Sequence, residues 1–373
     1  MKRLTVIQLL PELNGGGVER GTLEIAKGLV NAGHRSIVIS NGGRLVSELE
    51  RDGSEHIAVP VHKKSLWSLW QVPRLRKIFD EIKPDIIHAR SRMPAWLAYL
   101  AWKRQSFEQT RFITTVHGLY SVNAYSKIMV KGEAIIAVSE TVENYIKTNY
   151  PDVEQSKVVR IYRGISPAAF PYGFAASDEW LSQWRSQYPQ LINQTVLCLP
   201  GRLTRLKGHL DFLTLIASLH AQGTKVFGLV VGGEDPRRAS YAEEVRAKVI
   251  ELGLSDHIIF TGHRADIKEI YSVSDIVYSL SNKPESFGRT VLEPLAMGRP
   301  VIAYAHGGVA EILASLFPDG AVELKNLQQL IDKTRQQLDG AKKPNPHNPF
   351  LLDHMIQATL GLYQQLADSK PKS

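Results

Sequence analysis

The sequence has one cysteine among its 373 residues and no apolar stretch long enough to cross a membrane. A single cysteine excludes an intrachain disulfide framework, and the position of Cys198 in the apolar segment TVLCLP predicts a buried thiol. A membrane helix needs roughly 18 consecutive apolar residues. The N-terminal apolar run LTVIQLL is short and soon meets Pro11 and Glu12. We therefore expect a buried strand there instead of a signal peptide, and a cytoplasmic protein.

Several motifs that would direct the function elsewhere are also missing. No close spacing of His, Cys, Asp or Glu resembles a metal site, and no Gly-x-Ser-x-Gly elbow indicates a serine hydrolase. The glycine turn NGGGVERG is not followed by the Gly-Lys-Ser/Thr of a Walker loop. It also differs from the dinucleotide fingerprint, because Arg20 stands at the third glycine position and the second strand ends in Ser40-Asn41 without an acid. The turn can still bind an anion at a helix N-terminus, or be a plain tight turn.

The excess of positive charge is confined to the first half of the chain. The whole sequence has 45 Lys and Arg against 37 Asp and Glu, and residues 1–170 alone have 24 against 16. Residues 60–111 carry 11 basic side chains against 4 acidic ones. Such a region can meet a phosphorylated substrate, an anionic membrane or nucleic acid, or it can be a solvated basic surface.

Short apolar segments alternate with amphipathic helical patterns along the chain. Examples are SIVIS, DIIHA and AIIAVS in the first half, and VFGLVV, DIVYSL and PVIAYA in the second. Apolar strands that alternate with helices are typical of parallel sheets covered by helices on both faces. Because 373 residues are too many for one ordinary core, the pattern predicts an α/β protein with two doubly wound domains.

The two series of strands are separated by residues 166–194, which contain prolines and aromatic residues but no strand pattern. We expect an N-terminal domain over residues 1–168 and a C-terminal domain over residues 169–350. The segment KKPNPHNP then interrupts the chain. Residues 351–373 predict a last helix that packs back toward the N-terminal domain.

The segment PGRLTRLKGHL places two cations between a strand and a helix. Arg202 stands at the strand end and Lys207 at the helix start, with Gly201 and Gly208 beside them. A guanidinium and an ammonium group that converge on a helix N-terminus form a clamp for a diphosphate, although either one alone could be a solvated surface charge. The turns VGGE and TGHR follow two further strands of the same series. Several such turns on one edge of a sheet favour a nucleotide-binding crevice.

Two histidines, His88 and His117, stand at strand ends in the first half of the chain. A single histidine is more often structural than catalytic. Two at positions that face a crevice give the functional and structural interpretations about equal weight.

The segment PESFGRTVLEPLAMG carries two acids eight positions apart, Glu285 and Glu293. If its helix begins near Ser286 or Phe287, Glu285 lies just outside the N-terminus and Glu293 nearly two turns inside. A rise of about 1.5 Å per residue then separates the carboxylates by roughly 12 Å along the axis. A paired acid and base need about 5 to 10 Å. The spacing instead favours two acids that hold hydroxyls at opposite ends of a sugar nucleotide.

Together, these motifs resemble those of the retaining GT-B glycosyltransferases with a Glu-x7-Glu pair, the glycosyltransferase family 4-like group. The matching motifs, which span most of the chain, are Gly16-Gly17-Val18-Glu19, His117-Gly118, Arg163-Gly164-Ile165, Gly201-Arg202 with Lys207-Gly208, TGH at 261–263 and Glu285-x7-Glu293. The segments HARSRMPAW, GRLTRLKG and PESFGRT are most similar to a proteobacterial subgroup of lipopolysaccharide core glycosyltransferases. The resemblance implies a GT-B fold, in which two Rossmann-like domains face each other across a cleft.

The resemblance also implies roles for individual residues. Glu285 would contact the hydroxyls of the transferred sugar, Glu293 the ribose, and Arg202 and Lys207 the diphosphate of the donor. His117 corresponds to a histidine beside the donor sugar. The predicted catalytic residues are His117, Arg202, Lys207 and Glu285. The predicted donor-binding residues are Gly16, Gly17, Gly201, Arg202, Lys207, His263, Glu285, Phe287, Gly288, Arg289, Thr290 and Glu293. Arg289 belongs to the segment whose backbone would face the sugar and phosphates, but many members have an aliphatic residue there, so its side chain is given no role. Arg163 stands where many members have asparagine, which leaves any asparagine-dependent contact without its residue.

The implied activity is the transfer of a hexose, with retention, from a nucleotide sugar such as a GDP- or UDP-hexose to a glycan or glycolipid. Lipopolysaccharide core or other cell-envelope biosynthesis is the implied pathway, with no metal and no other cofactor. An anionic acceptor would meet the first domain at His88, Arg90 and Arg92. The tryptophans of the basic stretch either contact the anionic inner face of the cytoplasmic membrane or pack in the core, and they are Trp67, Trp70, Trp96 and Trp102.

Two other functions are compatible with this sequence. A nucleotide-sugar epimerase of similar architecture would act on the donor without an acceptor. A non-catalytic sugar-binding protein would also have two α/β lobes, but such proteins are usually exported. A nucleic-acid binder would explain the basic half but neither the glycine turns nor the Glu-x7-Glu segment, so we expect no nucleic-acid partner.

Overall fold

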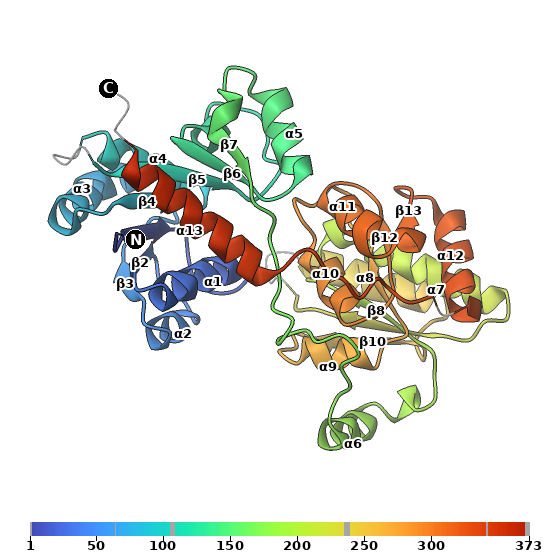
Figure 1. Ribbon diagram of the computed structural model, residues 1–373. Helices are drawn as coiled ribbons and strands as arrows, with labels where there is room; N and C mark the ends of the chain where they lie inside the picture. Colours follow the sequence, from blue (N-terminus) through green and yellow to red (C-terminus); the bar gives the residue numbers. More distant parts are fainter. Residues whose placement is uncertain (1, 64, 105–108, 235–238, 341, 370–373) are drawn as a thin grey trace. The chain divides into compact units, whose positions relative to one another are not determined.

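The computed structural model describes residues 2–63, 65–104, 109–234, 239–340 and 342–369. The chain forms two compact units (Figure 1). The N-terminal unit contains Met1–Gly164 together with Phe350–Ser373, and the C-terminal unit contains Ile165–Pro349. The sequence predicted a domain boundary after residue 168, and the structure divides the chain after Gly164.

The N-terminal unit is built on a seven-stranded sheet in which every pair of neighbouring strands is parallel. Its strands are β1 (Thr5–Leu9), β2 (Arg35–Ser40), β3 (Glu55–Ala58), β4 (Ile86–Ala89), β5 (Arg111–Val116), β6 (Ala134–Ala137) and β7 (Val158–Arg160). Their order in the sheet is β3-β2-β1-β4-β5-β6-β7. The strands are short, and the five inner ones, β2, β1, β4, β5 and β6, are almost wholly buried, as expected of a sheet that is covered on both faces.

Helices cover both faces of this sheet, and the alternation of strand side chains decides which residues face which layer. Ile7 and Leu9 of β1 pack into the core on the side of α3, α4 and α5, whereas Leu4 and Val6 pack on the side of α1 and α13. The helices are α1 (Gly17–Asn31), α2 (Val46–Arg51), α3 (Gln71–Ile82), α4 (Arg92–Trp102), α5 (Glu140–Asn149) and α13 (Leu352–Asp368). The 3₁₀ helices are Leu66–Trp70, Ser126–Val130 and Gln155–Lys157.

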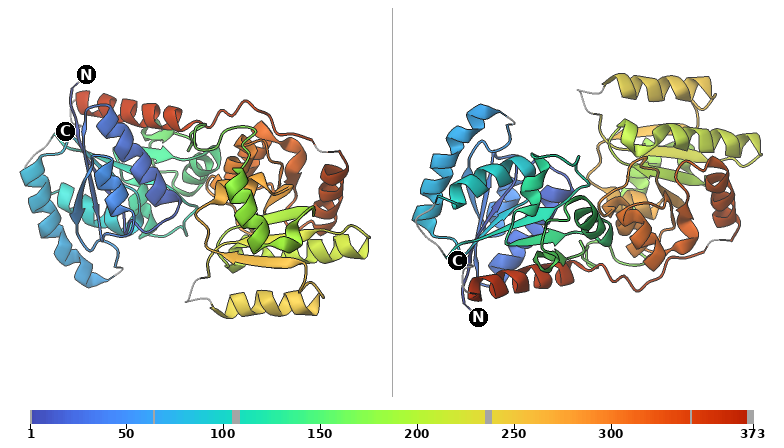
Figure 2. Two further views of the ribbon diagram at one scale, coloured as in Figure 1. Left: turned by 90° about the horizontal axis from the view of Figure 1, so that it is seen from below. Right: turned by 90° about the horizontal axis from the view of Figure 1, so that it is seen from above.

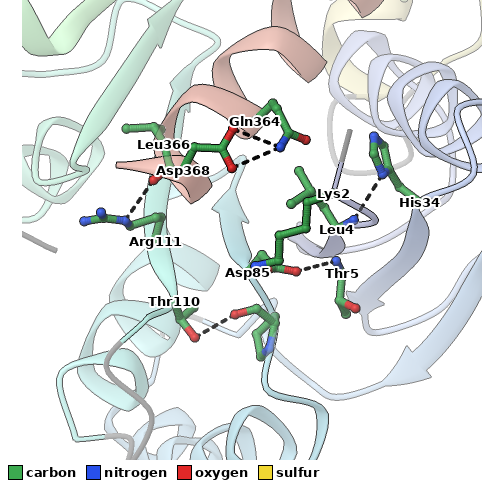
Figure 3. A network of polar contacts seen from close by, with 11 residues as sticks. Lys2, Leu4, Thr5, His34, Asp85, Thr110, Arg111, Gln364, Leu366 and Asp368 are labelled. Atoms are coloured by element: carbon green, nitrogen blue, oxygen red, sulfur yellow. Dashed lines mark hydrogen bonds and ion pairs between the residues drawn. The ribbon is translucent and has the colours of Figure 1, made fainter. Parts of the chain in front are cut away.

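The last helix, α13, belongs to the N-terminal unit although it follows the whole C-terminal unit in sequence. It lies beside α1 (Figure 2). Arg111 of β5 holds its C-terminal end, because the Arg111 Nε donates to the Leu366 carbonyl at 3.1 Å while Nη1 pairs with Glu133 at 2.8 Å. Figure 3 shows this contact. It also shows Asp85, just before β4, which accepts hydrogen bonds from the Lys2 ammonium and the Thr5 amide and so joins the start of β1 to the start of β4.

The C-terminal unit is built on a six-stranded parallel sheet of order β10-β9-β8-β11-β12-β13. Its strands are β8 (Val196–Pro200), β9 (Phe227–Val231), β10 (Ile258–Gly262), β11 (Ile276–Ser279), β12 (Val301–Tyr304) and β13 (Ala321–Val322). Leu197 and Leu199 pack into the core formed with α7, α8 and α12, while the buried Cys198 between them points to the opposite face.

The remaining elements of the C-terminal unit, within its described residues, are helices and 3₁₀ turns. The helices are α6 (Asp178–Gln187), α7 (His209–Ala221), α8 (Ala239–Glu251), α9 (Ile267–Ser272), α10 (Arg289–Ala296), α11 (Gly308–Leu316) and α12 (Leu327–Gly340). The 3₁₀ turns are Pro189–Leu191, Arg205–Lys207 and Pro318–Gly320. Within the described part of the chain, no helix has the length and apolar character needed to span a membrane.

Both sheets have the same doubly wound order, which confirms the predicted fold class of two Rossmann-like α/β domains. In each sheet the first strand in sequence lies at the centre, and the chain then adds strands on one side before it crosses to the other. The order therefore reverses between β1 and β4 in the first sheet and between β8 and β11 in the second. Loops that leave the carboxyl ends of such strand pairs diverge and leave a crevice, where ligands bind in open α/β sheets.

The contact between α1 and α13 depends on a glycine, and this dependence can be tested. A Cβ at Gly28 would lie 2.6 Å from Cγ2 of Ile356 on α13. We expect Gly28→Ala to lower the free energy of unfolding of the N-terminal unit by about 1 to 3 kcal/mol, because overpacking outweighs the better helix propensity of alanine. Calorimetric unfolding of Gly28→Ala, of Ile356→Ala and of the double variant measures the effect. A Gly28→Ala protein at least as stable as the original chain would contradict this packing.

Candidate functional site

The crevice of the C-terminal unit lies where the loops after β8 and β11 leave the sheet. The two strands are neighbours, with Leu197 opposite Ile276 and Cys198 opposite Val277. Asn282, just after β11, joins the loops: its amide N–H donates to the Leu206 carbonyl at 2.9 Å and its side chain to the Arg205 carbonyl at 2.8 Å. The cationic loop and the acidic segment, separated by about 80 positions in sequence, thus form one site.

A glycine makes the close approach of these two loops possible. Gly208 lies between the 3₁₀ turn Arg205–Lys207 and α7, with a φ of 71° in the left-handed region. A Cβ at this position would lie 2.1 Å from the carbonyl oxygen of Leu280. Only glycine combines this backbone conformation with this contact, so the glycine next to Lys207 fixes the position of that lysine against the end of β11.

The centre of the site is an ion pair between Lys207 and Glu285. The Lys207 Nζ lies 2.5 Å from the Glu285 Oε1, and the two side chains are 27% and 23% exposed. The Ser281 hydroxyl donates to the same carboxylate oxygen at 2.5 Å. The structure therefore brings together the two residues that the sequence assigned to the diphosphate and to the transferred sugar.

The Glu285 carboxylate is held in its charged form. Burial raises the pKa of this carboxyl group. The Lys207 charge, the hydrogen bonds from Lys207 and Ser281, and the nearby His306 together lower the pKa by more than burial raises it, so the pKa lies below its ordinary value. Glu285 is therefore an acceptor of hydrogen bonds at neutral pH. Such a group can bind hydroxyls but cannot donate a proton.

A third loop, after β12, supports Glu285 from behind. The Gly308 amide donates to the Glu285 carbonyl at 2.8 Å, and the His306 Nε2 lies 2.7 Å from the Ser281 carbonyl oxygen. A Cβ at Gly307 would lie 2.5 Å from the Glu285 carbonyl oxygen, so this loop also requires glycine. These residues were not among those predicted from the sequence. The segment HGG directly follows an apolar strand, as the selected glycine turns do, and that position could have identified it.

The start of α10 differs from the prediction. We expected a helix from Ser286 or Phe287, but α10 begins at Arg289 and Gly288 is its N-cap with a φ of 108°. The left-handed glycine interrupts the helix, and a Cβ there would lie 2.8 Å from Val309 Cγ2. Glu285 therefore lies before the helix, in an isolated parallel β-bridge with Gly307. The estimate of roughly 12 Å, which assumed one continuous helix of 1.5 Å rise, does not apply.

The second acid of the motif also has a cationic partner. The Arg289 Nε donates to the Glu293 Oε1 at 3.0 Å across one turn of α10, and the side chains are 20% and 13% exposed. The buried Tyr271 hydroxyl also bonds to Glu293, and burial and the Glu293 charge raise the pKa of Tyr271 well above its ordinary value. The tyrosine stays protonated and can donate. The Arg289 side chain, for which the sequence offered no role, thus holds one oxygen of Glu293.

The other predicted donor residues of this unit lie around the same edge of the sheet. Arg202 is exposed directly after β8, and among the described residues no ion pair or hydrogen bond engages its guanidinium. His263 is exposed after β10, two strands away from the reversal point. The side chain of Phe287 is buried, so only its backbone can face a ligand. The Thr290 hydroxyl is buried without a hydrogen-bond partner within the described part of the chain.

In the N-terminal unit, the glycine turn after β1 leads into α1, whose N-cap is Gly16. Gly15 and Gly16 both have a φ of 148°, and Gly16 and Gly17 are exposed. Arg163 donates to the Gly17 carbonyl at 2.5 Å. A Cβ at Gly21 would lie 2.1 Å from the same guanidinium, so α1 has a glycine where Arg163 crosses it. Arg163 therefore holds the first turn of α1 in place.

Three of the predicted residues gather at the reversal point of the first sheet. His88, Arg90 and His117 line one small cavity of about 20 Å³ together with Arg163. Arg90 is 4% exposed and donates to the Gln8 side chain at 2.8 Å. Burial lowers the pKa of His117 well below its ordinary value, and the charges of Arg90 and Arg163 act in the same direction. His117 is therefore neutral near pH 7.

The prediction that His88 binds an acceptor does not fit its surroundings. His88 is fully buried in β4, and its ring nitrogens lie 2.6 Å from the Tyr363 hydroxyl of α13 and 2.6 Å from the Thr115 hydroxyl. A side chain with no exposed surface and both nitrogens bonded offers nothing to an acceptor. Burial lowers its pKa well below the ordinary value, so it stays a neutral structural link between the sheet and α13.

Arg92 lies apart from this cluster, in the first turn of α4. Its guanidinium lies 4.6 Å from the ring centre of Tyr120 and 5.2 Å from that of Tyr125, and it donates to Ser126 at 3.2 Å. The tryptophans of the basic stretch divide into two pairs. Trp67 and Trp70 are 77% and 74% exposed. The other two pack against the core, and their indole N–H groups donate to the carbonyls of Tyr125 and Thr110.

No group of three or more His, Cys, Asp or Glu in the described segments is arranged to hold a metal ion.

Comparison with known proteins gives two adjoining family matches. Residues 15–169 match the model of Glycosyltransferase Family 4, and residues 182–346 match Glycosyl transferases group 1. A crystal structure of a glycosyltransferase from Rickettsia africae is 32% identical, with a TM-score of 0.87, and covers 99% of this chain and 100% of its own. The structure of Anabaena HepE in complex with UDP-glucose is 21% identical, with a TM-score of 0.76, and covers 98% of this chain and 99% of its own. The lipopolysaccharide core biosynthesis mannosyltransferase LpcC of Rhizobium leguminosarum is 26% identical over 52% of this chain and 51% of its own length.

The Lys207–Glu285 pair predicts a specific dependence of stability on pH. Because the folded-state pKa of Glu285 is lowered, its contribution is complete above the unfolded-state pKa of about 4.3 and is lost as the pH falls through the lower folded value. At pH 7 we expect Glu285→Gln to lower the free energy of unfolding by about 1 to 2 kcal/mol. Calorimetry at a series of pH values should show this difference shrink below about pH 4. A difference that is constant through the acid range would contradict a charged partner for Lys207.

Proposed function

Since this chain belongs to the glycosyltransferases whose N-terminal half matches family 4 and whose C-terminal half matches group 1, we propose that it transfers a hexose from a nucleotide sugar to a glycan or glycolipid, with retention of configuration. We place this reaction in lipopolysaccharide core or other cell-envelope biosynthesis. The relative LpcC, a mannosyltransferase of lipopolysaccharide core biosynthesis, supports the pathway. The solved neighbour HepE was crystallised with UDP-glucose, which supports a nucleotide hexose as donor.

The observation that carries this proposal is the Lys207–Glu285 pair at the reversal point of the C-terminal sheet. An ammonium group suits the diphosphate and a carboxylate suits sugar hydroxyls, and here they lie 2.5 Å apart. A nucleotide sugar has the matching arrangement, because its diphosphate is bonded directly to the sugar. When the donor binds there, Lys207 would pair with the diphosphate and Glu285 with the sugar hydroxyls, in place of their contact with each other.

The reaction breaks the bond between the anomeric carbon and the diphosphate oxygen. A bond from the same carbon to an acceptor hydroxyl forms on the same face, and the hydroxyl proton passes to the leaving phosphate. Positive charge develops on the sugar and negative charge on the phosphate. Lys207 and the exposed Arg202 stabilise the phosphate charge, which is the main electrostatic requirement of the reaction.

The remaining residues orient the donor. Glu285, held by Ser281 and charged at neutral pH, accepts hydrogen bonds from the sugar hydroxyls. Glu293, with one oxygen bonded to Arg289, accepts from the ribose. In this proposal, the two cations supply the charge at the diphosphate, and no metal ion or further cofactor takes part.

We further propose that the N-terminal unit contacts the inner face of the cytoplasmic membrane. Trp67, Leu69 and Trp70 are 77%, 45% and 74% exposed and follow one another on the 3₁₀ helix Leu66–Trp70. Tryptophan favours the interface between lipid and water, and neighbouring lysines and arginines favour anionic lipid. Residues 60–111 carry the basic excess described above.

Substitution of the central pair tests the function. We expect Lys207→Ala and Glu285→Ala each to lower turnover at least 100-fold, because each removes a group that acts on the bond being broken. Arg205→Ala is the matched control: Arg205 lies in the same 3₁₀ turn as Lys207, but its side chain pairs with Glu244 on the surface. Turnover near normal in either of the first two variants, with the fold intact by calorimetry, would contradict the assignment.

The assay for these variants also separates the two kinds of enzyme. Nucleotide sugars are screened for binding by thermal stabilisation, and the products formed from the donor alone are analysed. A transferase hydrolyses its donor slowly, whereas an epimerase returns a changed nucleotide sugar. Epimerised donor in the absence of acceptor would replace the transferase proposal.

Membrane contact is tested with vesicles. We expect the protein to sediment with vesicles that contain phosphatidylglycerol at low salt, and to remain in solution with neutral phosphatidylcholine vesicles or at high salt. The double variant Trp67→Ala/Trp70→Ala should reduce the bound fraction several-fold. Sedimentation that does not depend on anionic lipid or salt would argue against this contact.

A further inference from the structure

An apolar groove lies on the surface of the N-terminal unit, next to the exposed tryptophans. Its volume is about 660 Å³, within the range of small-molecule binding sites. It is lined by Ser65, Leu69, Arg92, Met93, Trp96, Leu100 and Tyr125. None of these residues belongs to the two clusters at the sheet edges. The groove is therefore a separate feature of this unit.

The groove follows one face of α4. Arg92, Met93, Trp96 and Leu100 lie at spacings of one, four and eight residues, which places them on the same side of the helix. The Trp96 indole N–H donates to the Tyr125 carbonyl at 2.9 Å, so the ring is fixed as a wall of the groove. Leu69, 45% exposed, contributes from the 3₁₀ helix.

Cations surround this apolar surface and lie over its aromatic rings. The Arg92 guanidinium, in the first turn of α4, lies 5.2 Å from the centre of the Tyr125 ring. The Lys131 Nζ lies 5.8 Å from the centre of the Trp96 ring. The Lys103 Nζ lies 5.2 Å from the centre of the Tyr99 ring, which is on α4 but does not line the groove. Among the described residues that line the groove, none has a carboxylate. An occupant that complements these charges has an apolar body and an anionic end.

We propose that this groove binds the hydrocarbon chain of an anionic, lipid-linked acceptor, with the anionic group of that lipid at Arg92. Free sugars and nucleotides have no apolar segment that would fill it, whereas a hydrocarbon chain is stabilised by removal of its methylene groups from water. The inference rests on the proposed transferase function and selects a glycolipid over a free glycan as acceptor. Membrane contact through the tryptophans would then present the lipid to the groove.

The binding step is tested without any assay of transfer. Decyl phosphate, kept below its micelle concentration, is titrated calorimetrically into the full chain. We expect saturable binding that weakens at least tenfold in Leu69→Asp, because the new carboxylate repels the phosphate and removes apolar lining. Ile250→Asp is the matched control, because it makes the same kind of change at an exposed aliphatic residue of the C-terminal unit, and it should bind decyl phosphate normally. Ile250 is 72% exposed. Inorganic phosphate should not compete.

The role of Arg92 is tested by comparing two amphiphiles. Arg92→Gln should weaken decyl phosphate several-fold and leave the binding of neutral decyl glucoside unchanged, because only the phosphate needs the cation. Equal loss for both amphiphiles would place the head group elsewhere. No binding of decyl phosphate to the unsubstituted protein, or normal binding to Leu69→Asp, would overturn the groove as a lipid site.

A kinetic comparison links the groove to the acceptor. Leu69→Asp should raise KM at least tenfold for a lipid-linked acceptor, and should leave unchanged both the KM for the same glycan without its lipid and the hydrolysis of donor alone. An equal KM for both acceptors in the unsubstituted protein would contradict this proposal. Absence of donor hydrolysis in the unsubstituted protein would contradict the transferase function instead. The binding of decyl phosphate would then still support the groove as a lipid site.

Discussion

The reversal of strand order between β8 and β11 determines where the chemistry of the C-terminal unit lies. Because these strands are neighbours and parallel, the loops that follow them emerge at one edge, and Gly208 lets them approach until Lys207 meets Glu285 at 2.5 Å. The hydrogen bonds that Asn282 donates to the Leu206 and Arg205 carbonyls join the two loops. The rest of the site follows from this junction: the β12 loop packs behind Glu285, and Gly288 starts α10 immediately after it.

The charges of this site are balanced locally. Lys207 pairs with Glu285 and Arg289 with Glu293, so each acid of the motif has a cation. A bound diphosphate would compete with Glu285 for Lys207, while the sugar hydroxyls would replace the lysine as partners of Glu285. A ligand that carries only one of these groups leaves a partly buried charge without its partner, which is unfavourable. The pair therefore favours a diphosphate and a sugar joined in one molecule. Glu293 differs, because Arg289 and Tyr271 can keep their bonds while a second oxygen accepts from a ribose.

The sequence predicted those parts of the structure that depend on local pattern. Apolar segments that alternate with helical patterns predicted two parallel sheets. Glycines beside cations at a strand end predicted the loop after β8 that carries Arg202 and Lys207. The start of α10 was predicted too early, because helix propensity in SFGRTVLE does not reveal that Gly288 adopts a left-handed φ against Val309. The partners of Lys207 and Arg289 could not be predicted, since pairing depends on strand order and on side-chain direction. For the same reason His88 looked like a crevice residue, although contacts with Tyr363, distant in sequence, bury it completely.

Two groups of cations in the N-terminal half differ in burial and have different consequences. Arg90 and Arg163 are 4% and 7% exposed and bond to Gln8 and to the Gly17 carbonyl, so their charge supports the fold around the first glycine turn. The cations near α4 instead lie over aromatic rings beside an apolar groove. A nucleic-acid surface needs exposed cations that track successive phosphates, and an apolar groove would be exposed to water in such a complex. Cations around an apolar groove complement an amphiphile, whose single anionic group and hydrocarbon body use both parts at once. In the proposed membrane contact, this arrangement would give a function to the exposed Trp67 and Trp70, whereas Trp96 and Trp102 pack against the core.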